Sequence, residues 1–432
     1  MRILVTGAYG LIGSACLARL HAAGHDLVAA GRAAAPRRRF PYAHWITADF
    51  ARLTKPPLWL PLLAGIDAVV NCVGVLQDGA RDNVQRVQFD GTVALFEACA
   101  QAGVKRVVHI SAIGAEPDGP SAFSRSKAAA AARLKTLALD WVIVRPGLVL
   151  APAVYGGSAL LRGLAAFPLC LPLVGADARI QIVDVDDLAE TVARAVAPAA
   201  PAKVAWDVAH PQVHTLADIA CAVRAWLGFR PRRVVRLPRA IAAVVTTLGD
   251  AAGWLGWRSP MRSTGLAQLE AGVVGDPRPW MAATGIEPRS LDGSLAAHCA
   301  SVQDRWFARL YLLKPLALLT LAAITIAAGL EELITFWIMR VGLFDVPFRI
   351  AAITVLPILV HSVIAPVIGV GILVRATSRL ALSALLLVTI FGILDYALRP
   401  AYHLDIGVLH ALAFQVPMLL AILFTLAILD ER

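Results

Sequence analysis

Short apolar runs alternate with longer periodic stretches through the first half of the chain. The apolar runs are rich in Val, Ile and Leu and end near a glycine or a polar residue, as buried strands commonly do. They occupy residues 3–5, 26–30, 44–47, 67–71, 106–110 and 141–144. Stretches of helical periodicity lie between them, at residues 11–23, 82–102 and 121–138. Because parallel strands need long crossovers, this alternation predicts an α/β Rossmann fold, a doubly wound parallel sheet, over residues 1–229.

The pattern changes after about residue 306, where polar positions become rare. Apolar segments of about twenty residues follow one another at 315–339, 350–374, 380–398 and 409–429. A helix of about twenty apolar residues is long enough to cross the hydrocarbon core of a bilayer. The sequence therefore predicts an all-α domain over residues 306–432, a bundle of four transmembrane helices.

A basic and aromatic juxtamembrane region, residues 230–305, separates these two parts. Clustered arginines precede an apolar run at 240–248, and tryptophans follow it. These residues are Arg230, Arg232, Arg233, Arg236, Arg239, Trp254 and Trp257. The combination is typical of a helix that lies on an anionic membrane surface. A solvated basic loop beside a core helix has the same pattern and stays open as an alternative.

The charges beside the apolar segments predict their orientation. Six basic residues flank the side that carries the N-terminal domain: Arg305, Arg309, Lys314, Arg375, Arg379 and Arg432. Three flank the other side: Arg340, Arg349 and Arg399. Lys and Arg collect on the cytoplasmic side of membrane proteins. We therefore expect a multi-pass protein of the cell inner membrane whose N-terminal domain and C-terminus are both cytoplasmic.

Composition and charge narrow the choice of partners. Hydrophobic residues make up 58% of the 432 positions and charged residues only 16%, below the roughly 25% usual in soluble domains. A net charge of +10 suits nucleic acid, anionic lipid or a phosphate-bearing ligand. Because no nucleic-acid-binding motif accompanies it, we expect membrane lipid and no nucleic acid as a partner. The six cysteines lack the spacing of a zinc site or a disulfide framework, so no metal is expected.

A glycine-rich turn follows the first predicted strand and opens the first predicted helix. Gly7 suits the tight turn, Gly10 lets the backbone approach a pyrophosphate, and Gly13 lets the helix pack close to the strand. Leu11 and Ile12 begin the helix, whose free N–H groups attract phosphate. The motif predicts a dinucleotide-binding site.

The end of the second predicted strand favours NADP(H) over NAD(H). An NAD-preferring site usually has Asp or Glu there to hold the ribose 2′-hydroxyl. This chain has Arg32, with Arg37, Arg38 and Arg39 just beyond. A guanidinium pairs well with a 2′-phosphate, although a solvated loop arginine would leave the same pattern.

Several motifs together resemble an extended or atypical short-chain dehydrogenase/reductase, close to the group that includes the accessory subunit of respiratory complex I. They are Thr6-Gly7-x-x-Gly10-x-x-Gly13, Asp49, Asn71-Cys72-Val73-Gly74, Gly91-Thr92, Val108-His109-Ile110-Ser111, Ser126-Lys127 and Arg145-Pro146-Gly147. The resemblance implies that the glycine turn and Leu11 and Ile12 hold the pyrophosphate, and that Asp49 contacts the adenine. It further implies that Cys72, Val73 and Gly74 line the ribose and nicotinamide, which Pro146 and Gly147 flank. Ser111 and Lys127 would be catalytic, and Lys127 would also hold the ribose.

One position departs from that family. Its chemistry uses a tyrosine four residues before the lysine, and this chain has Phe123 there. Phenylalanine has no ionisable group and cannot act as a general acid or base. The sequence thus indicates cofactor binding and leaves open whether the protein is an enzyme. Tyr155, on the following loop, is a candidate replacement acid.

The apolar half resembles the DoxX-like family of four-helix membrane domains, through the sequence Leu313-Lys-Pro-Leu-Ala-Leu-Leu and the later Ala-Gly-Leu-Glu. Its few ionisable residues include Glu331, Glu332, His361 and Asp395. Because charge is costly in hydrocarbon, we expect these groups to face the bundle interior or the membrane interface.

These features lead to two main hypotheses and a third. The first is a membrane-anchored NAD(P)H-dependent oxidoreductase that acts on a lipophilic or quinone-like substrate. The second is a non-catalytic NADPH-binding factor for the assembly or stability of a membrane respiratory complex. The third is a redox-sensing membrane protein whose bundle responds to cofactor occupancy.

Overall fold

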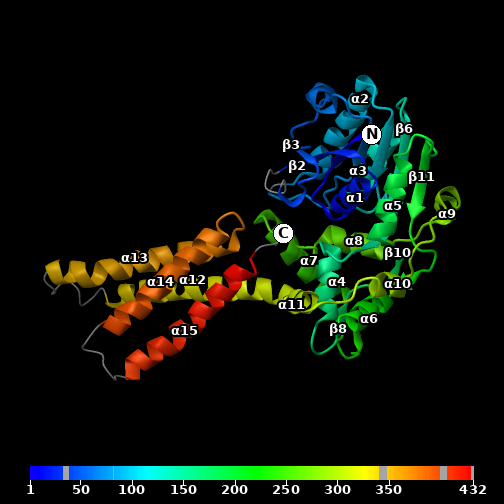
Figure 1. Ribbon diagram of the computed structural model, residues 1–432. Helices are drawn as coiled ribbons and strands as arrows, with labels where there is room; N and C mark the ends of the chain where they lie inside the picture. The colour runs from blue at the N-terminus through cyan, green and yellow to red at the C-terminus, as the bar shows by residue number, and fades with distance from the viewer. Residues whose placement is uncertain (33–37, 81, 340–347, 399–405, 430–432) are drawn as a thin grey trace. The chain divides into compact units, whose positions relative to one another are not determined.

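The computed structural model describes the chain except residues 33–37, 81, 340–347, 399–405 and 430–432 (Figure 1). It divides into two compact units. The first comprises residues 1–254 and 258–308, and the second comprises residues 255–257 and 309–432. Each unit is described by itself below.

A seven-stranded parallel sheet forms the centre of the first unit. Its strands are β1 (Arg2–Thr6), β2 (Asp26–Gly31), β3 (His44–Thr47), β4 (Ala68–Asn71), β5 (Arg106–Ile110), β6 (Asp140–Pro146) and β11 (Val204–Val208). Their order is β11-β6-β5-β4-β1-β2-β3, and each neighbouring pair is parallel. The order reverses between β1 and β4, where open α/β sheets bind their ligands. The predicted doubly wound Rossmann sheet is confirmed.

Helices cover both faces of this sheet. They are α1 (Leu11–Ala22), α2 (Gly91–Ala102), α3 (Ala122–Lys135) and α5 (Val185–Ala195). Alternate residues of β1 point to opposite faces, so Val5 packs in the core that contains Leu17 and Leu188, whereas Leu4 packs in the core that contains Leu95. A π-helical turn (Gln85–Asp90) precedes α2, and two short 3-10 turns (Pro56–Leu58 and Leu60–Leu63) precede β4. α1 and α3 lie within a few residues of the predicted helices, and the predicted helix at 82–102 consists of the π-helical turn followed by α2.

A smaller lobe of the first unit follows the sheet. It contains two-residue and three-residue strands: β7 (Leu148–Leu150), β8 (Leu171–Leu173), β9 (Arg179–Ile180), β10 (Ile182–Asp184), β12 (His214–Thr215) and β13 (Val234–Arg236). Its helices are α4 (Gly157–Ala165), α6 (Leu216–Trp226), α7 (Arg239–Trp254), α8 (Ser263–Ala271), α10 (Leu291–Ala296) and α11 (Val302–Tyr311), the last continuing into the second unit. Between α8 and α10, α9 (Arg278–Thr284) packs on the core of the main sheet.

Residues 230–305, which the sequence sets apart as a juxtamembrane region, are built into the first unit except for residues 255–257. The reason is long-range packing, which the local pattern of apolar and basic residues does not reveal. β13 pairs with β8, and the fully buried Trp280 of α9 belongs to the same core as β1 and α5.

Four long helices make up the second unit. They are α12 (Leu313–Met339), α13 (Phe348–Leu373), α14 (Ser378–Leu398) and α15 (Ile406–Ala427). α12 and α13 pack closely through glycine: a Cβ on Gly369 would stand 2.9 Å from the backbone oxygen of Ala322. Within the described residues, one helix, at Leu313–Thr335, is long and apolar enough to cross a membrane. A bundle of four spans therefore remains a prediction.

Candidate functional site

The glycine turn after β1 has the close packing that a dinucleotide site needs. Gly7 has a φ of +65°, which favours glycine, and a Cβ there would stand 2.9 Å from the backbone of Cys72. A Cβ on Gly13 would stand only 2.2 Å from the Gly7 oxygen. Gly10 is the N-cap residue of α1, and it has no side chain that would obstruct a phosphate at the start of the helix. Leu11 and Ile12 form the first turn of α1, whose N–H groups are available to phosphate.

Buried hydrogen bonds hold the loop after β4 against this turn. Thr6 donates from its hydroxyl to Asn71 Oδ1 at 2.7 Å, and the Val73 N–H donates to the same oxygen at 3.2 Å. Asn71 Nδ2 lies 3.2 Å from His109 Nδ1. Burial, with Lys127 nearby, holds the pKa of His109 well below its ordinary value, so the ring is neutral. Cys72, Val73 and Gly74 follow directly and share one edge of the sheet with the glycine turn.

Lys127 and Ser111 lie at the same edge and are both buried. The Lys127 amine donates to the Ile110 carbonyl at 2.7 Å, and burial lowers its pKa to about 8. A Cβ on Gly74 would stand 3.6 Å from the Lys127 Nζ atom, so the amine faces the loop of residues 72–74. The Ser111 hydroxyl has no hydrogen-bond partner among the described residues. A buried hydroxyl of this kind indicates a missing ligand or water.

The Phe123 ring occupies the place next to Lys127, with the Nζ atom 5.8 Å from the ring centroid. Nothing on this ring can donate or accept a proton. Tyr155, the candidate replacement acid, is an exposed side chain whose hydroxyl accepts a 3.5 Å hydrogen bond from Arg258. The structure thus places Lys127 against the Ile110 carbonyl, next in the chain to Ser111, and has Phe123 beside Lys127 where the resemblance expects tyrosine.

Arg32 directly follows β2 and forms an ion pair with Asp82. The Nη1 atom lies 2.6 Å from the Asp82 carboxylate, which also lies 3.3 Å from Arg258. Although burial disfavours the charge, Asp82 raises the pKa of Arg32 above its ordinary value. Asp82 was not foreseen as a site residue, because it is fifty positions away from Arg32 in the chain. Arg37 lies outside the described residues.

The remaining predicted positions flank this edge of the sheet. Asp49 follows β3 and accepts a 3.1 Å hydrogen bond from the Ala51 N–H, which is a turn-forming role. Pro146 ends β6, and its carbonyl accepts from the Ile113 N–H at 3.2 Å. A Cβ on Gly147 would stand 2.5 Å from the Gln181 oxygen, so the chain needs glycine there. Gln88, which sequence reasoning missed, links the Val75 N–H to the Ser126 hydroxyl beside Lys127.

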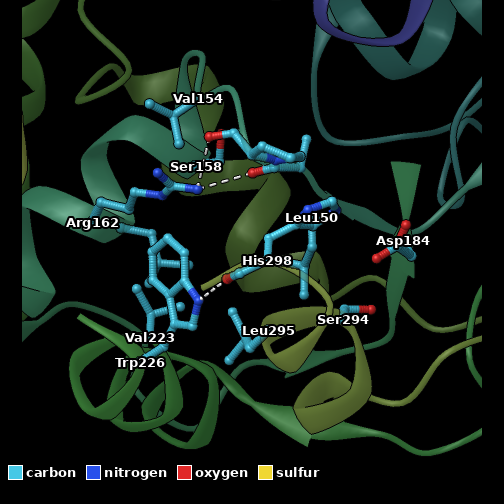
Figure 2. A pocket seen from close by; sticks show the side chains of 13 residues that line it. Leu150, Val154, Ser158, Arg162, Asp184, Val223, Trp226, Ser294, Leu295 and His298 are labelled. Carbon is cyan, nitrogen blue, oxygen red and sulfur yellow. Dashed lines mark hydrogen bonds between the residues drawn. The ribbon is translucent and has the colours of Figure 1, made fainter. Parts of the chain in front are cut away.

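A separate pocket lies in the smaller lobe (Figure 2). The Arg162 guanidinium donates to the carbonyls of Ala151 and Pro152 and to the Asp304 carboxylate, and it lies over the Trp226 ring. Every group of Arg162 is therefore used within the lobe. None of the predicted cofactor residues lines this pocket, and we interpret Arg162 as structural.

In the second unit, two predicted polar residues meet. Glu332 of α12 and His361 of α13 are 2.7 Å apart, with each side chain about 40% exposed. Glu331 is exposed. The side chain of Asp395 lies outside the described residues. The sequence identified Glu332 and His361 as ionisable residues of the apolar half, but it did not indicate that they pair.

Comparisons with known proteins agree with this geometry. Residues 7–161 match the family described as NAD(P)H-binding. An uncharacterized protein of Mycobacterium tuberculosis is 31% identical over 45% of this chain and 20% of its own length. The chain thus spans about a fifth of that relative. An NAD(P)H azoreductase of Xenophilus azovorans is 27% identical over 54% of this chain and 77% of its own length.

Further matches concern a respiratory subunit and the fold. The mitochondrial 40 kDa subunit of NADH-ubiquinone oxidoreductase from Neurospora crassa is 24% identical over 44% of this chain and 49% of the subunit. The Bordetella bronchiseptica enzyme WbmH, solved with NAD+, aligns at a TM-score of 0.53 and 20% identity, covering 72% of this chain and 98% of that one. A UDP-glucose 4-epimerase of Thermotoga maritima aligns at 0.53 and 15% identity, covering 72% of this chain and 100% of its own. These structures are similar in fold.

The fold and site define a dinucleotide-binding domain of the Rossmann class. More specifically, the first unit contains an NAD(P)H-binding domain, because its residues 7–161 match the family described in those words. A cofactor of this class fits the residues present, because the turn has no room for side chains at Gly7 and Gly13, and the Ser111 hydroxyl lacks a partner among the described residues.

Proposed function

We propose that this protein is a membrane-anchored oxidoreductase that uses NADPH in preference to NADH and reduces a lipophilic, quinone-like substrate. The observation that carries the proposal is a buried Lys127, which donates to the carbonyl of Ile110, next in the chain to a buried Ser111 whose hydroxyl has no partner among the described residues. A bound nicotinamide cofactor supplies a hydride, that is, two electrons and one hydrogen nucleus. The chain's own residues then have to position the acceptor, which must also gain one proton.

The lack of an acid at position 123 supports a quinone as the acceptor. Hydride addition to an ordinary carbonyl develops an alkoxide, a strong base that depends on a nearby general acid. A quinone that gains a hydride becomes a delocalised phenolate, a weaker base that one further proton converts to the hydroquinone. The Ser111 hydroxyl would donate a hydrogen bond to such an oxygen. The one proton that completes the hydroquinone would come from solvent. Phe123 offers an apolar ring surface to an aromatic substrate.

The apolar second unit supports an anchored protein with a lipophilic substrate. Its candidate span at Leu313–Thr335 could hold the chain at a membrane, where quinones dissolve. The DoxX-like bundle of four spans, with both termini cytoplasmic, is part of the same proposal. In that orientation the first unit would lie on the side where NADPH is made.

A turnover assay tests the proposal on the full chain in detergent or nanodiscs. NADPH consumption is followed with a short-chain quinone and with a simple ketone. We expect turnover with the quinone, its loss in Lys127→Met, and little turnover with the ketone. Phe123→Tyr supplies the missing acid and should raise the ketone rate. A wild-type protein that binds NADPH but reduces no quinone would contradict the enzymatic proposal.

The alternative is a non-catalytic NADPH-binding factor for the assembly or stability of a membrane respiratory complex. Phe123 favours it, as does the likeness to the 40 kDa subunit. In that case deletion of the gene should lower the amount of an assembled respiratory complex, and Lys127→Met should fail to restore it. A deletion strain with normal complexes would exclude this function.

A further inference from the structure

Helix α7 has its large apolar side chains on the outside of the first unit. Val244 and Leu248 are 62% and 66% exposed, and Ile241 is 45% exposed. They recur at intervals of three and four residues, so they form one stripe along the helix. Core helices of soluble proteins turn such a stripe inward. We define the exposed side chains of Ile241, Val244, Val245 and Leu248 as the α7 stripe.

The face of α7 that packs against the segment leading into α8 consists of small residues. A Cβ on Gly249 would stand 1.7 Å from the Met261 oxygen, and a Cβ on Gly253 would stand 2.6 Å from the Arg262 guanidinium. Ala242 is 2% exposed. Because only small side chains fit against the segment that leads into α8, α7 cannot turn its stripe inward.

Exposed arginines precede the stripe. Arg236 and Arg239 pair with Asp177 and Glu270, respectively. A further three, Arg230, Arg232 and Arg233, are exposed and have no carboxylate partner in the part of the chain that the structure describes. An apolar helix face that follows a run of unpaired cationic side chains in the chain matches the chemistry of an anionic lipid surface, in which acyl chains lie beneath negative headgroups.

We propose that α7 lies in the plane of an anionic membrane leaflet, with its stripe immersed and the arginines at the headgroups. The inference rests on the membrane anchoring in the proposed function, but it does not depend on turnover. It assigns a lipid-binding surface to the NAD(P)H-binding unit itself, separate from the long helices of the second unit.

Hydrogen bonds connect the inner face of α7 to the loop that follows Gly74 of the candidate cofactor site. Asp250 accepts a 2.7 Å hydrogen bond from Gln77, in the loop that follows Gly74. Arg262 binds Asp250 and donates to the Asp78 carbonyl at 2.7 Å. On α8, Gln268 donates to Ser121, the N-cap of the helix that carries Lys127. A leaflet under α7 would therefore lie on the other side of this helix from Gln77 and Asp78, in the loop that follows Gly74.

Spin labels on the full chain in nanodiscs test the proposal. Cysteines replace Val244 and Leu248 on the stripe and, as a matched control, Ala243, which is exposed on a different side of α7. The exposed native Cys221 and Cys299 are replaced by serine. Collision of each label with oxygen, which concentrates in lipid, is compared with collision with a water-soluble nickel chelate. NADPH affinity and quinone turnover are measured on the same discs.

In discs with anionic lipid, labels at 244 and 248 should collide mainly with oxygen, and the label at 243 with nickel. The contrast should shrink in discs of neutral lipid and in the double variant Arg232→Gln/Arg233→Gln. If the nickel chelate reached the labels at 244 and 248 as readily as the label at 243, the proposal would be overturned. Shielding of 244 and 248 from both reagents would also overturn it, because another part of the chain or a second copy would then cover the stripe. Immersed labels without turnover would leave this proposal standing and remove the enzymatic one.

Discussion

At the scale of single residues, the buried Lys127 makes cofactor binding sensitive to pH. Its pKa is about 8, lowered by burial from 10.5. A charged amine donates a stronger hydrogen bond to a ribose hydroxyl than a neutral one, and the free protein loses this proton as pH rises through about 8. We expect NADPH affinity to fall roughly 10-fold between about pH 7 and about pH 9, as calorimetry would measure.

Lys127→Met is the control for this effect, because it should bind weakly at both pH values without the decline. Unfolding cannot account for the predicted loss. A lysine whose folded pKa is depressed costs stability while charged, and this cost disappears as pH rises from about 8 towards 10.5, so the free protein becomes more stable over that interval. An affinity that stays constant with pH would mean that Lys127 does not hold the cofactor.

Asp82 is expected to reduce the preference for NADPH. Its carboxylate holds Arg32 at 2.6 Å and would compete with a 2′-phosphate for the same guanidinium. Asp82→Asn should therefore strengthen NADPH binding several-fold and leave NADH binding unchanged, as titration of cofactor fluorescence would measure. Arg32→Ala should weaken NADPH binding by one to two orders of magnitude, on the order of 1.4–2.7 kcal/mol. Equal affinities for both cofactors in the wild type would show that Arg32 does not select NADPH.

At the scale of elements, the junction of β1 and α1 depends on close backbone packing. A methyl group at Gly13 would meet the Gly7 oxygen at 2.2 Å, so the helix would have to move away from the strand. Gly13→Ala should destabilise the protein by about 1–3 kcal/mol and abolish high-affinity NADPH binding. Thermal unfolding and calorimetry measure the two effects.

Gly157→Ala is the matched control for that substitution. Gly157 begins α4 with no atom within 4 Å of an added Cβ, and alanine favours helix. Its stability should be unchanged or slightly higher, with normal cofactor affinity. Tight NADPH binding by Gly13→Ala would place the pyrophosphate elsewhere.

At the scale of the whole molecule, topology decides which compartment each site faces. Single cysteines at Thr377, in the turn between α13 and α14, and at Ala401, which lies outside the described residues, distinguish the two orientations. In a background without other cysteines, an impermeant thiol reagent added to intact cells should label position 401 and not 377. The reverse pattern would put the NAD(P)H-binding unit on the outside and remove its supply of cofactor.

The sequence by itself determined the features that local sterics and composition control. A strand followed by Gly7, Gly10 and Gly13 predicts a dinucleotide-binding turn, because each glycine meets a local steric requirement. These requirements are the tight turn, the approach of a pyrophosphate, and the packing of the helix against the strand. The parallel sheet followed from strands that alternate with helices. The loss of the tyrosine at Phe123 is a matter of side-chain chemistry and needs no structure.

Only the tertiary structure decided what long-range packing controls. The sequence placed Arg32 at the strand end, but its partner Asp82, which also pairs with Arg258, comes from a distant part of the chain. The sequence also identified the apolar run at 240–248 and left open whether its helix lies on a membrane surface or in the core. The direction of this apolar face depends on the volume available at Gly249 and Gly253, where the neighbouring segment leaves room only for small residues. A helical period shows which residues share a face, whereas the shape of the opposing surface decides which face is buried.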